Sequence, residues 1–230
     1  MDPEVRLGYR GQGRVPVRER GKMNWQRRSV LMGVVLVPLA GCLQPEPPEI
    51  APLDYAARRD GRHMIPAIDM SQIPEWLHRQ VVPFATEEPP GTIVILSDQG
   101  LLHLVLEDGY ALRYGISVGQ EGLGWTGEAE IYRTAHWPTW TPTPAMIARN
   151  PAAYERYADG KPGGPRNPLG ARALYLRTIA TGRDEGIRIH GTPEWRSIGR
   201  RASQGCFRML QHDVIDLYGR VGRGTRVVVL

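Results

Sequence analysis

The sequence has only two cysteines and two phenylalanines among its 230 residues, and it lacks any long apolar run. Two cysteines, Cys42 and Cys206, cannot make a disulfide-rich scaffold. The CxxC and HxxxH spacings of zinc sites are also absent, so we expect no metal and no other cofactor. The longest apolar stretch, residues 29–40, has about a dozen residues, whereas a membrane-spanning helix needs about 20.

The body of the chain also lacks a net charge. The formal charge is +5, but residues 1–41 hold eight of the 29 basic side chains and only three of the 24 acidic ones. The remaining chain is therefore formally neutral. A nucleic-acid-binding protein would carry its basic excess on the folded domain, so we exclude that class.

Glycine and proline are abundant instead, with 27 and 20 copies, and 41% of the residues are hydrophobic. The length suits one ordinary domain with extra segments, and the hydrophobic content suffices for a packed core. This composition is typical of a loop-rich β fold.

The N-terminal 41 residues read as an export leader. Residues 23–28 are basic, and residues 29–40 form a short apolar core. The following Leu39-Ala40-Gly41-Cys42 resembles a bacterial lipobox, in which the cysteine is lipidated; an ordinary cleavage site beside an incidental cysteine is the alternative. We expect export to the periplasm or cell envelope and a membrane anchor at Cys42.

The sequence of this leader leaves the export route and the target membrane undecided. Arg27-Arg28 before the apolar core also resembles a twin-arginine signal, which leaves the export route undecided. Residues 1–22 do not fit a normal leader, so we expect translation to begin at Met23. The choice between the inner and the outer membrane is open as well.

Residues 42–90 are expected to form a tether and an approach segment. The tether, residues 44–49, is rich in proline and glutamate and reads as extended. The approach segment contains a possible short helix over residues 72–79 and apolar side chains for contacts with the domain. A run of Glu, Pro and Gly at residues 87–91 predicts the start of the main domain, residues 91–230.

The main domain is predicted to be mostly β. Strands are expected over residues 92–96, 101–106, 110–118, 128–136, 171–177, 186–189 and 225–230. One or two short helices are expected within 144–157, and one substantial helix over 210–221. Trp137 and Trp140 lie in a proline-stiffened loop that either lines a cleft or packs on the core.

The stretch from residue 190 to residue 208 contains the candidate catalytic residues. The last of the strands before it is expected to deliver His190 at its end, and a small polar turn precedes Cys206. A histidine near a cysteine can take the thiol proton and later return it to a leaving amine. Backbone N–H groups around Gly205 and Cys206 can bind an oxyanion, and Arg208 can hold a carboxylate bidentately.

His190-Gly191-Thr192, followed after the intervening loop by Ser203-Gln204-Gly205-Cys206-Phe207-Arg208, resembles the signature of L,D-transpeptidases with a YkuD-like catalytic domain. The resemblance covers roughly residues 91–230 and implies a β-sandwich-like fold. It implies Cys206 as nucleophile, His190 as base, and the Gly191 carbonyl as the group that orients His190. Ser203, Gly205, Arg208 and Thr192 would shape the oxyanion and substrate site. Gln204 departs from the histidine that is usual there.

We therefore expect a lipid-anchored, envelope-facing transpeptidase that acts on peptidoglycan stem peptides, in cell wall biogenesis and cell shape. It would form 3→3 cross-links through a thioester, or attach an envelope protein to the wall. Two alternatives remain: an L,D-carboxypeptidase, if water resolves the thioester, and a catalytically idle wall-binding protein. The histidine precedes the cysteine in the sequence, which is the reverse of the order in papain-like peptidases.

Overall fold

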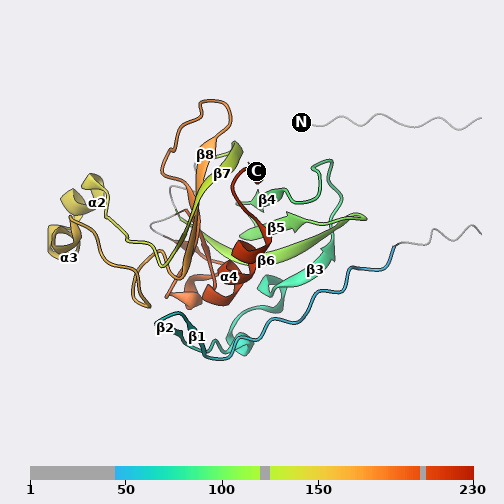
Figure 1. Cartoon of the computed structure of the whole chain (residues 1–230), viewed down its shortest axis with the longest axis horizontal. Coiled ribbons are helices and arrows are strands. Elements are labelled where there is room, and N and C mark those ends of the chain that lie inside the picture. The colour runs from blue at the N-terminus through green and yellow to red at the C-terminus, as the bar shows by residue number, and fades with distance from the viewer. Residues whose placement is uncertain (1–44, 120–124, 203–205) are drawn as a thin grey trace, which may run out of the picture. The chain divides into compact units, whose positions relative to one another are not determined.

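The computed structural model describes residues 45–119, 125–202 and 206–230. One ten-stranded sheet forms the centre of the described chain, which has few helices (Figure 1). The predicted mostly β fold is thereby confirmed. None of the helices in these three ranges has the length and apolar character that crossing a membrane requires.

Ten strands make up the main sheet. Around the sheet, β6 (Tyr110–Gly119) is followed by β11 (Phe207–Met209), β9 (Arg188–Gly191), β8 (Arg172–Thr178), β7 (Gly127–His136), β12 (Arg226–Val229), β4 (Ile93–Leu96) and β5 (Leu101–Val105). Because β5 also pairs with β6, this row of eight strands closes on itself. Two further strands, β3 (Gln80–Pro83) and β10 (Arg201–Ala202), join β6.

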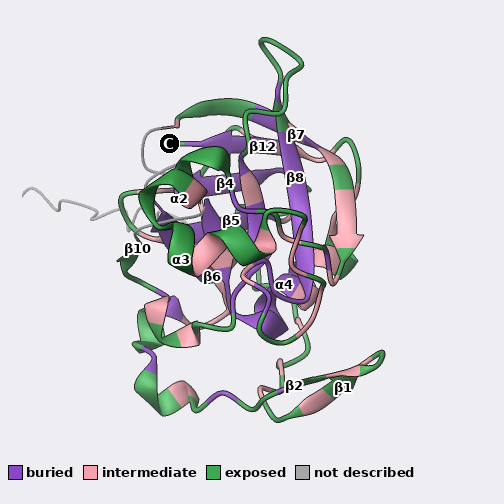
Figure 2. Cartoon of the chain, turned by 90° about the vertical axis from the view of Figure 1, so that its left-hand side faces the viewer, coloured by how far each residue is buried: buried purple, intermediate pink, exposed green. Residues whose placement is uncertain are grey.

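Burial explains these strands. β4, β5 and β8 are short apolar runs whose residues are almost all buried, as Figure 2 shows. The turn between β5 and β6 uses Asp108 and Gly109, whose φ angles are 58° and 77°. Positive φ at both central residues is the geometry of a tight hairpin turn whose twist matches the strands, and an Asp-Gly pair favours it. The hairpin predicted here is confirmed.

The helices lie outside the sheet. Two short ones, α2 (Pro144–Arg149) and α3 (Pro151–Tyr154), lie in the predicted region. The longest described helix is α4 (Gln211–Arg220), which begins just after β11 and buries Val214 and Leu217. The spacing of these apolar residues along one helix face predicted this element.

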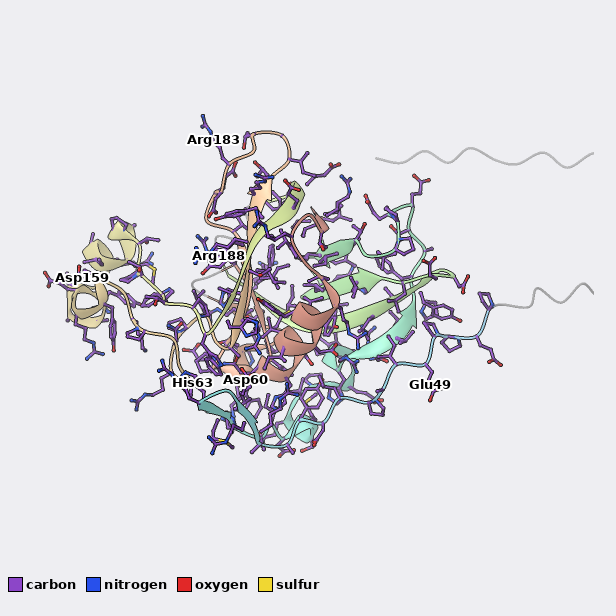
Figure 3. All side chains as sticks on the ribbon, in the orientation of Figure 1. Glu49, Asp60, His63, Asp159, Arg183 and Arg188 are labelled. Carbon is purple, nitrogen blue, oxygen red and sulfur yellow. The ribbon has the colours of Figure 1, made fainter. Side chains whose placement is uncertain are left out.

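The approach segment folds with the domain. It contains a small hairpin of β1 (Arg58–Asp60) and β2 (His63–Ile65), and two single 3-10 turns in place of the short helix expected over residues 72–79. The carboxylate of Asp60, which is labelled in Figure 3, accepts from Arg172 on β8 at 2.7 Å. Tyr55 donates to Asp213 on α4 at 2.7 Å, and Arg79 pairs with Asp216 at 2.9 Å. Three separate polar contacts therefore bind this segment to the sheet and to α4.

Two local expectations need correction. His190 lies inside β9 and not after its end, because pairing with β11 extends the strand through Gly191. The strands β3 and β11 were also missed. β3 contains Pro83, which lowers strand propensity, and it pairs on only one side, with β6. β11 has only three residues and is flanked by the cysteine turn and α4.

Candidate active site

Two neighbouring strands bring the predicted nucleophile and base together. β9 and β11 are parallel, with Ile189 opposite Phe207 and His190 opposite Arg208. Side chains alternate between the two faces of a strand, and directly paired residues share a face. Cys206 immediately precedes β11, so its side chain shares a face with Arg208 and His190.

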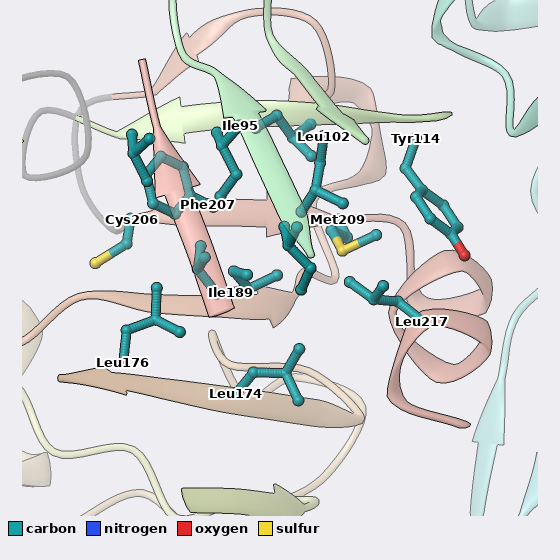
Figure 4. Packing of buried hydrophobic residues seen from close by; sticks show 14 of the residues in the cluster. Ile95, Leu102, Tyr114, Leu174, Leu176, Ile189, Cys206, Phe207, Met209 and Leu217 are labelled. Atoms are coloured by element: carbon teal, nitrogen blue, oxygen red, sulfur yellow. The ribbon is translucent and has the colours of Figure 1, made fainter. Parts of the chain in front are cut away.

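The core lies on the other face of this strand pair. Phe207 and Ile189 are completely buried in the main apolar cluster, and Cys206 belongs to the same cluster at 5% exposure. Figure 4 shows the Cys206 sulfur pointing away from Phe207 and Ile189. The Sγ atom donates to the carbonyl oxygen of Gly186 at 3.2 Å. The thiol is thus held against the backbone just before β9.

His190 is held by the backbone. Its Nδ1 lies 2.8 Å from the carbonyl oxygen of Gly191. A carbonyl only accepts, so Nδ1 carries the hydrogen and Nε2 keeps its lone pair. The contact that the family resemblance implied for Gly191 is therefore present in the structure.

Burial keeps the His190 ring neutral. It lowers the pKa of His190 to about 4, and the charges of Arg208 and Arg188 act in the same direction. The carbonyl groups of Gly191 and Pro168 oppose this effect because they favour the protonated ring. At neutral pH the imidazole is uncharged and able to accept a proton.

The loop that contains Pro168 is organised by Asn167, which is 1% exposed. Its amide nitrogen donates to three backbone carbonyls of the surrounding loops, those of Pro138, Lys161 and Pro162. Its amide oxygen accepts from the Leu169 N–H at 2.8 Å. One side chain thereby fixes the backbone on both sides of the proline whose carbonyl acts on His190.

Gly191 is needed for close packing. A Cβ atom there would collide with the side chain of Gln211, whose Oε1 accepts from the Ala171 N–H at 2.8 Å. Gln211 is the first residue of α4, so the helix end, β8 and β9 meet at this point. Only glycine lets the strand run this close to the helix while it supplies a carbonyl to His190.

Arg208 points to the same face, with a side chain that is 15% exposed. Its Nη1 lies 3.4 Å from the Glu194 carboxylate, which is 74% exposed. This contact is long and reaches solvent on one side. An incoming carboxylate can therefore compete with Glu194 for the guanidinium.

Thr192 belongs to the margin of the site. Its hydroxyl accepts from the Glu194 N–H at 3.1 Å, and its side chain is buried. With Trp137 and Trp195 it lines a cavity of about 70 Å³. Trp137 is therefore both a cavity wall and a fixed residue, since its indole donates to Asp60 at 2.7 Å. Trp140 lies away from this cavity, against Tyr154 and Tyr157.

Three predicted residues lie outside the described part of the chain: Cys42, Ser203 and Gly205. Within the described ranges, no three side chains of the His, Cys, Asp and Glu types gather as a metal site would require. The described groups supply a thiol, a neutral imidazole and an arginine. They suit acyl transfer through a thioester.

Three residues near the predicted site, Arg188, Tyr175 and Arg133, were not predicted from the sequence. Arg188 lies two positions before His190 in β9, and alternation alone would have put both on one face. Tyr175 and Arg133, on the next two strands, lie in the same row as Arg188. No local sequence signal links these two to the site, because the contact depends on strand pairing.

Comparison with known proteins gives one family. The L,D-transpeptidase catalytic domain model (YkuD) matches residues 90–229. A putative L,D-transpeptidase of Fuscovulum blasticum is 42% identical over 106 residues, which are 45% of this chain and 49% of that protein. The probable L,D-transpeptidase YbiS of Escherichia coli K12 is 40% identical over 116 residues, 49% of this chain and 35% of that protein. These alignments thus span half or less of the curated relatives' lengths.

Among solved structures, one described as a probable carnitine operon oxidoreductase from Brucella melitensis is similar. It is 49% identical, and the match covers 70% of this chain and 99% of that chain with a TM-score of 0.49. No oxidoreductase role is carried over from that description. The family match rests on the catalytic-domain model and the curated relatives.

Proposed function

The chain belongs to the YkuD family of L,D-transpeptidase catalytic domains, and on that premise we propose that it is a peptidoglycan L,D-transpeptidase with Cys206 as nucleophile and His190 as base. The observation that carries the proposal is the parallel pairing of β9 and β11. That pairing orients both side chains to one face, and the Gly191 carbonyl sets the histidine tautomer.

In the first half-reaction, Nε2 of His190 takes the proton of the Cys206 thiol. The sulfur attacks the carbonyl carbon at the third residue of a donor stem peptide, meso-diaminopimelate in our proposal. A carbon–sulfur bond forms and the carbonyl π electrons move to oxygen. When the tetrahedral intermediate collapses, the carbon–nitrogen bond to terminal D-alanine breaks, and His190 returns the proton to the leaving amine.

In the second half-reaction, a side-chain amine of another stem attacks the thioester carbonyl. An amide bond forms, the carbon–sulfur bond breaks, and the amine proton passes through His190 to the sulfur. The product is a 3→3 cross-link, and the enzyme is regenerated. A lysine of an envelope protein as acceptor would attach that protein to the wall. This role fits cell wall biogenesis and cell shape.

The test is incubation of the full-length chain with disaccharide-tetrapeptide and analysis of the products by mass. A cross-linked dimer with loss of D-alanine is the expected result, and Cys206→Ala should give none. A tripeptide product without dimer would instead identify an L,D-carboxypeptidase. Unchanged substrate with both proteins would favour the idle wall-binding protein.

We also propose that the chain is exported and anchored through a lipid on Cys42. The support is the lipobox-like Leu39-Ala40-Gly41-Cys42 after a short apolar core. Metabolic labelling with a tagged fatty acid tests it: label is expected on the wild-type chain and should disappear in Cys42→Ala. Equal labelling of both chains, or none, would contradict the proposal.

A further inference from the structure

A row of three side chains crosses the sheet beside the nucleophile. Arg133 on β7 lies opposite Tyr175 on β8, and Tyr175 lies opposite Arg188 on β9. Both guanidinium groups lie over the tyrosine ring, at 4.4 Å and 5.0 Å from its centre. We call Arg133, Tyr175 and Arg188 the arginine–tyrosine row.

The strand register places Cys206 level with this row. Phe207 is paired with Ile189, so the preceding residue of each strand, Cys206 and Arg188, lie level with each other. Because paired residues share a face, the row continues from Arg188 to the thiol. Arg208, which the family resemblance assigned to substrate binding, follows Cys206 along β11. The thiol therefore has one arginine beside it across the strands and another along its own strand.

The charges of the row are incompletely balanced. Arg188 has Asp184 at 3.4 Å, and Asp184 also accepts from the Tyr132 hydroxyl at 2.6 Å. Arg133 makes no ion pair with any carboxylate in the described part of the chain, and it is exposed. Two guanidinium groups held against one ring repel each other, and an anion bound over the row relieves that repulsion.

The row is also preorganised. Tyr175 is only 6% exposed, and its ring fixes both guanidinium groups by cation–π contact. The Arg188 side chain keeps 26% of its surface exposed. Figure 3 shows Arg188 beside β7 and β8. Less side-chain entropy is lost when such a fixed cation binds a carboxylate than when a mobile lysine does.

We propose that the arginine–tyrosine row is a second anion subsite, which binds a carboxylate on the acyl side of the donor peptide's scissile bond. The proposal rests on the proposed function, because it takes Cys206 as the point where the donor is attacked. The ligand class is a peptide donor with at least two carboxylates, one for Arg208 and one for the row. A donor that carries amides in place of the acyl-side carboxylates is expected to be a poorer substrate.

The test combines changes in the enzyme with changes in the donor. Two tetrapeptide donors are compared, one with free acyl-side carboxylates and one with these groups amidated. With the full-length wild-type chain, amidation should lower kcat/KM about tenfold, the effect of one charge-assisted contact. In Arg188→Gln and in Arg133→Gln, the ratio between the two donors should fall toward one.

Arg177→Gln is the matched control. Arg177 lies two residues after Tyr175 on the same face of β8, but it is paired with Glu130 at 2.6 Å. This variant should discriminate between the donors as the wild type does. Wild-type discrimination in Arg133→Gln and in Arg188→Gln would overturn the proposal. Arg133 is exposed, so its substitution tests the subsite even if the Arg188 variant fails to fold.

A binding measurement separates this proposal from the proposed function. Calorimetry with Cys206→Ala and the same two donors needs no turnover. Preferential binding of the free carboxylates, lost on adding Arg188→Gln or Arg133→Gln, would support the subsite even if the wild type formed no product. Turnover by the wild type without such preference would leave the transpeptidase standing and refute the subsite.

Discussion

The Nδ1 atom of His190 lies 2.8 Å from the carbonyl oxygen of Gly191, the next residue in the chain. The tautomer of the base is therefore set by the backbone, without a carboxylate to stabilise the imidazolium. With a pKa near 4, the ring accepts the thiol proton only transiently. The positive charges of Arg208 and Arg188 also disfavour a protonated His190 ring.

His190 should make the fold sensitive to acid. Its pKa is about 4 when folded and about 6.5 when unfolded. Below pH 6.5 the unfolded chain binds a proton that the folded chain does not, so the stability falls as the pH drops from 6.5 to 4. The loss from this residue should reach roughly 3 kcal/mol. Urea unfolding of the wild type and of His190→Gln, at several pH values, measures it as a difference that changes with pH.

A constant difference between these two proteins from pH 7.5 to pH 4 would contradict this assignment. The wild type alone is insufficient, because burial also lowers the pKa of His103, to about 4. His103 titrates in both proteins, so its contribution cancels in the comparison.

Asp213 should have the opposite effect from His190: it should make the folded chain more stable in acid than at neutral pH. It is fully buried, and burial raises its pKa to about 7 despite the hydrogen bond from Tyr55. Its folded pKa exceeds the unfolded value near 4, so the stability is highest below pH 4 and falls as the pH rises to 7. Asp213→Asn has no such titration. We expect this variant to match the wild type at pH 4 and to exceed its stability at pH 8, by chemical denaturation.

Deletion of the approach segment should destabilise the domain. A chain that begins at residue 91 loses Asp60, which pairs with buried Arg172, and Tyr55, which donates to buried Asp213. Asp216 loses Arg79 but keeps Arg220 and Tyr114. A buried charge that loses its partner costs about 3–5 kcal/mol. Chains of residues 45–230 and 91–230 should differ by many degrees in Tm by circular dichroism. Equal Tm values would mean that the segment only rests on the surface.

The proposed pair of Cys206 and His190 could be named from the sequence because its signal is local. The residue types, their order and the small residues before Cys206 are enough to predict a cysteine nucleophile with a histidine base. The arginine–tyrosine row was not predictable, since Arg133 and Arg188 lie 55 positions apart and meet only through the register of three strands.

The elements of the fold also differ in how well the sequence predicts them. The buried apolar strands and α4 can be predicted from the pattern of apolar residues along the sequence. The short strand β11 depends on its neighbours β9 and β6 for every backbone partner, and local propensity carries no such information. The sequence alone suggests that the approach segment is loosely connected to the domain. Its contacts are made by polar side chains whose partners lie far away in the sequence, so no local pattern predicts them.

Loss of the base should block acylation of Cys206. His190→Gln removes the proton acceptor, and general base catalysis contributes about 10²–10⁴-fold. His103→Gln is the matched control, because His103 is equally buried and has a similarly lowered pKa. It lies on β5, where it stacks on Phe84, whereas His190 lies on β9. Rates of acylation by a tetrapeptide donor should be near wild type for this control.

The central claim is that Cys206 forms a thioester with a stem peptide. Intact-protein mass spectrometry of the chain, quenched in acid during incubation with tetrapeptide donor alone, tests it most directly. We predict an added mass equal to the donor minus D-alanine, located on Cys206, absent in Cys206→Ala and strongly reduced in His190→Gln. An unmodified wild-type chain, or an adduct that persists in Cys206→Ala, would contradict the account.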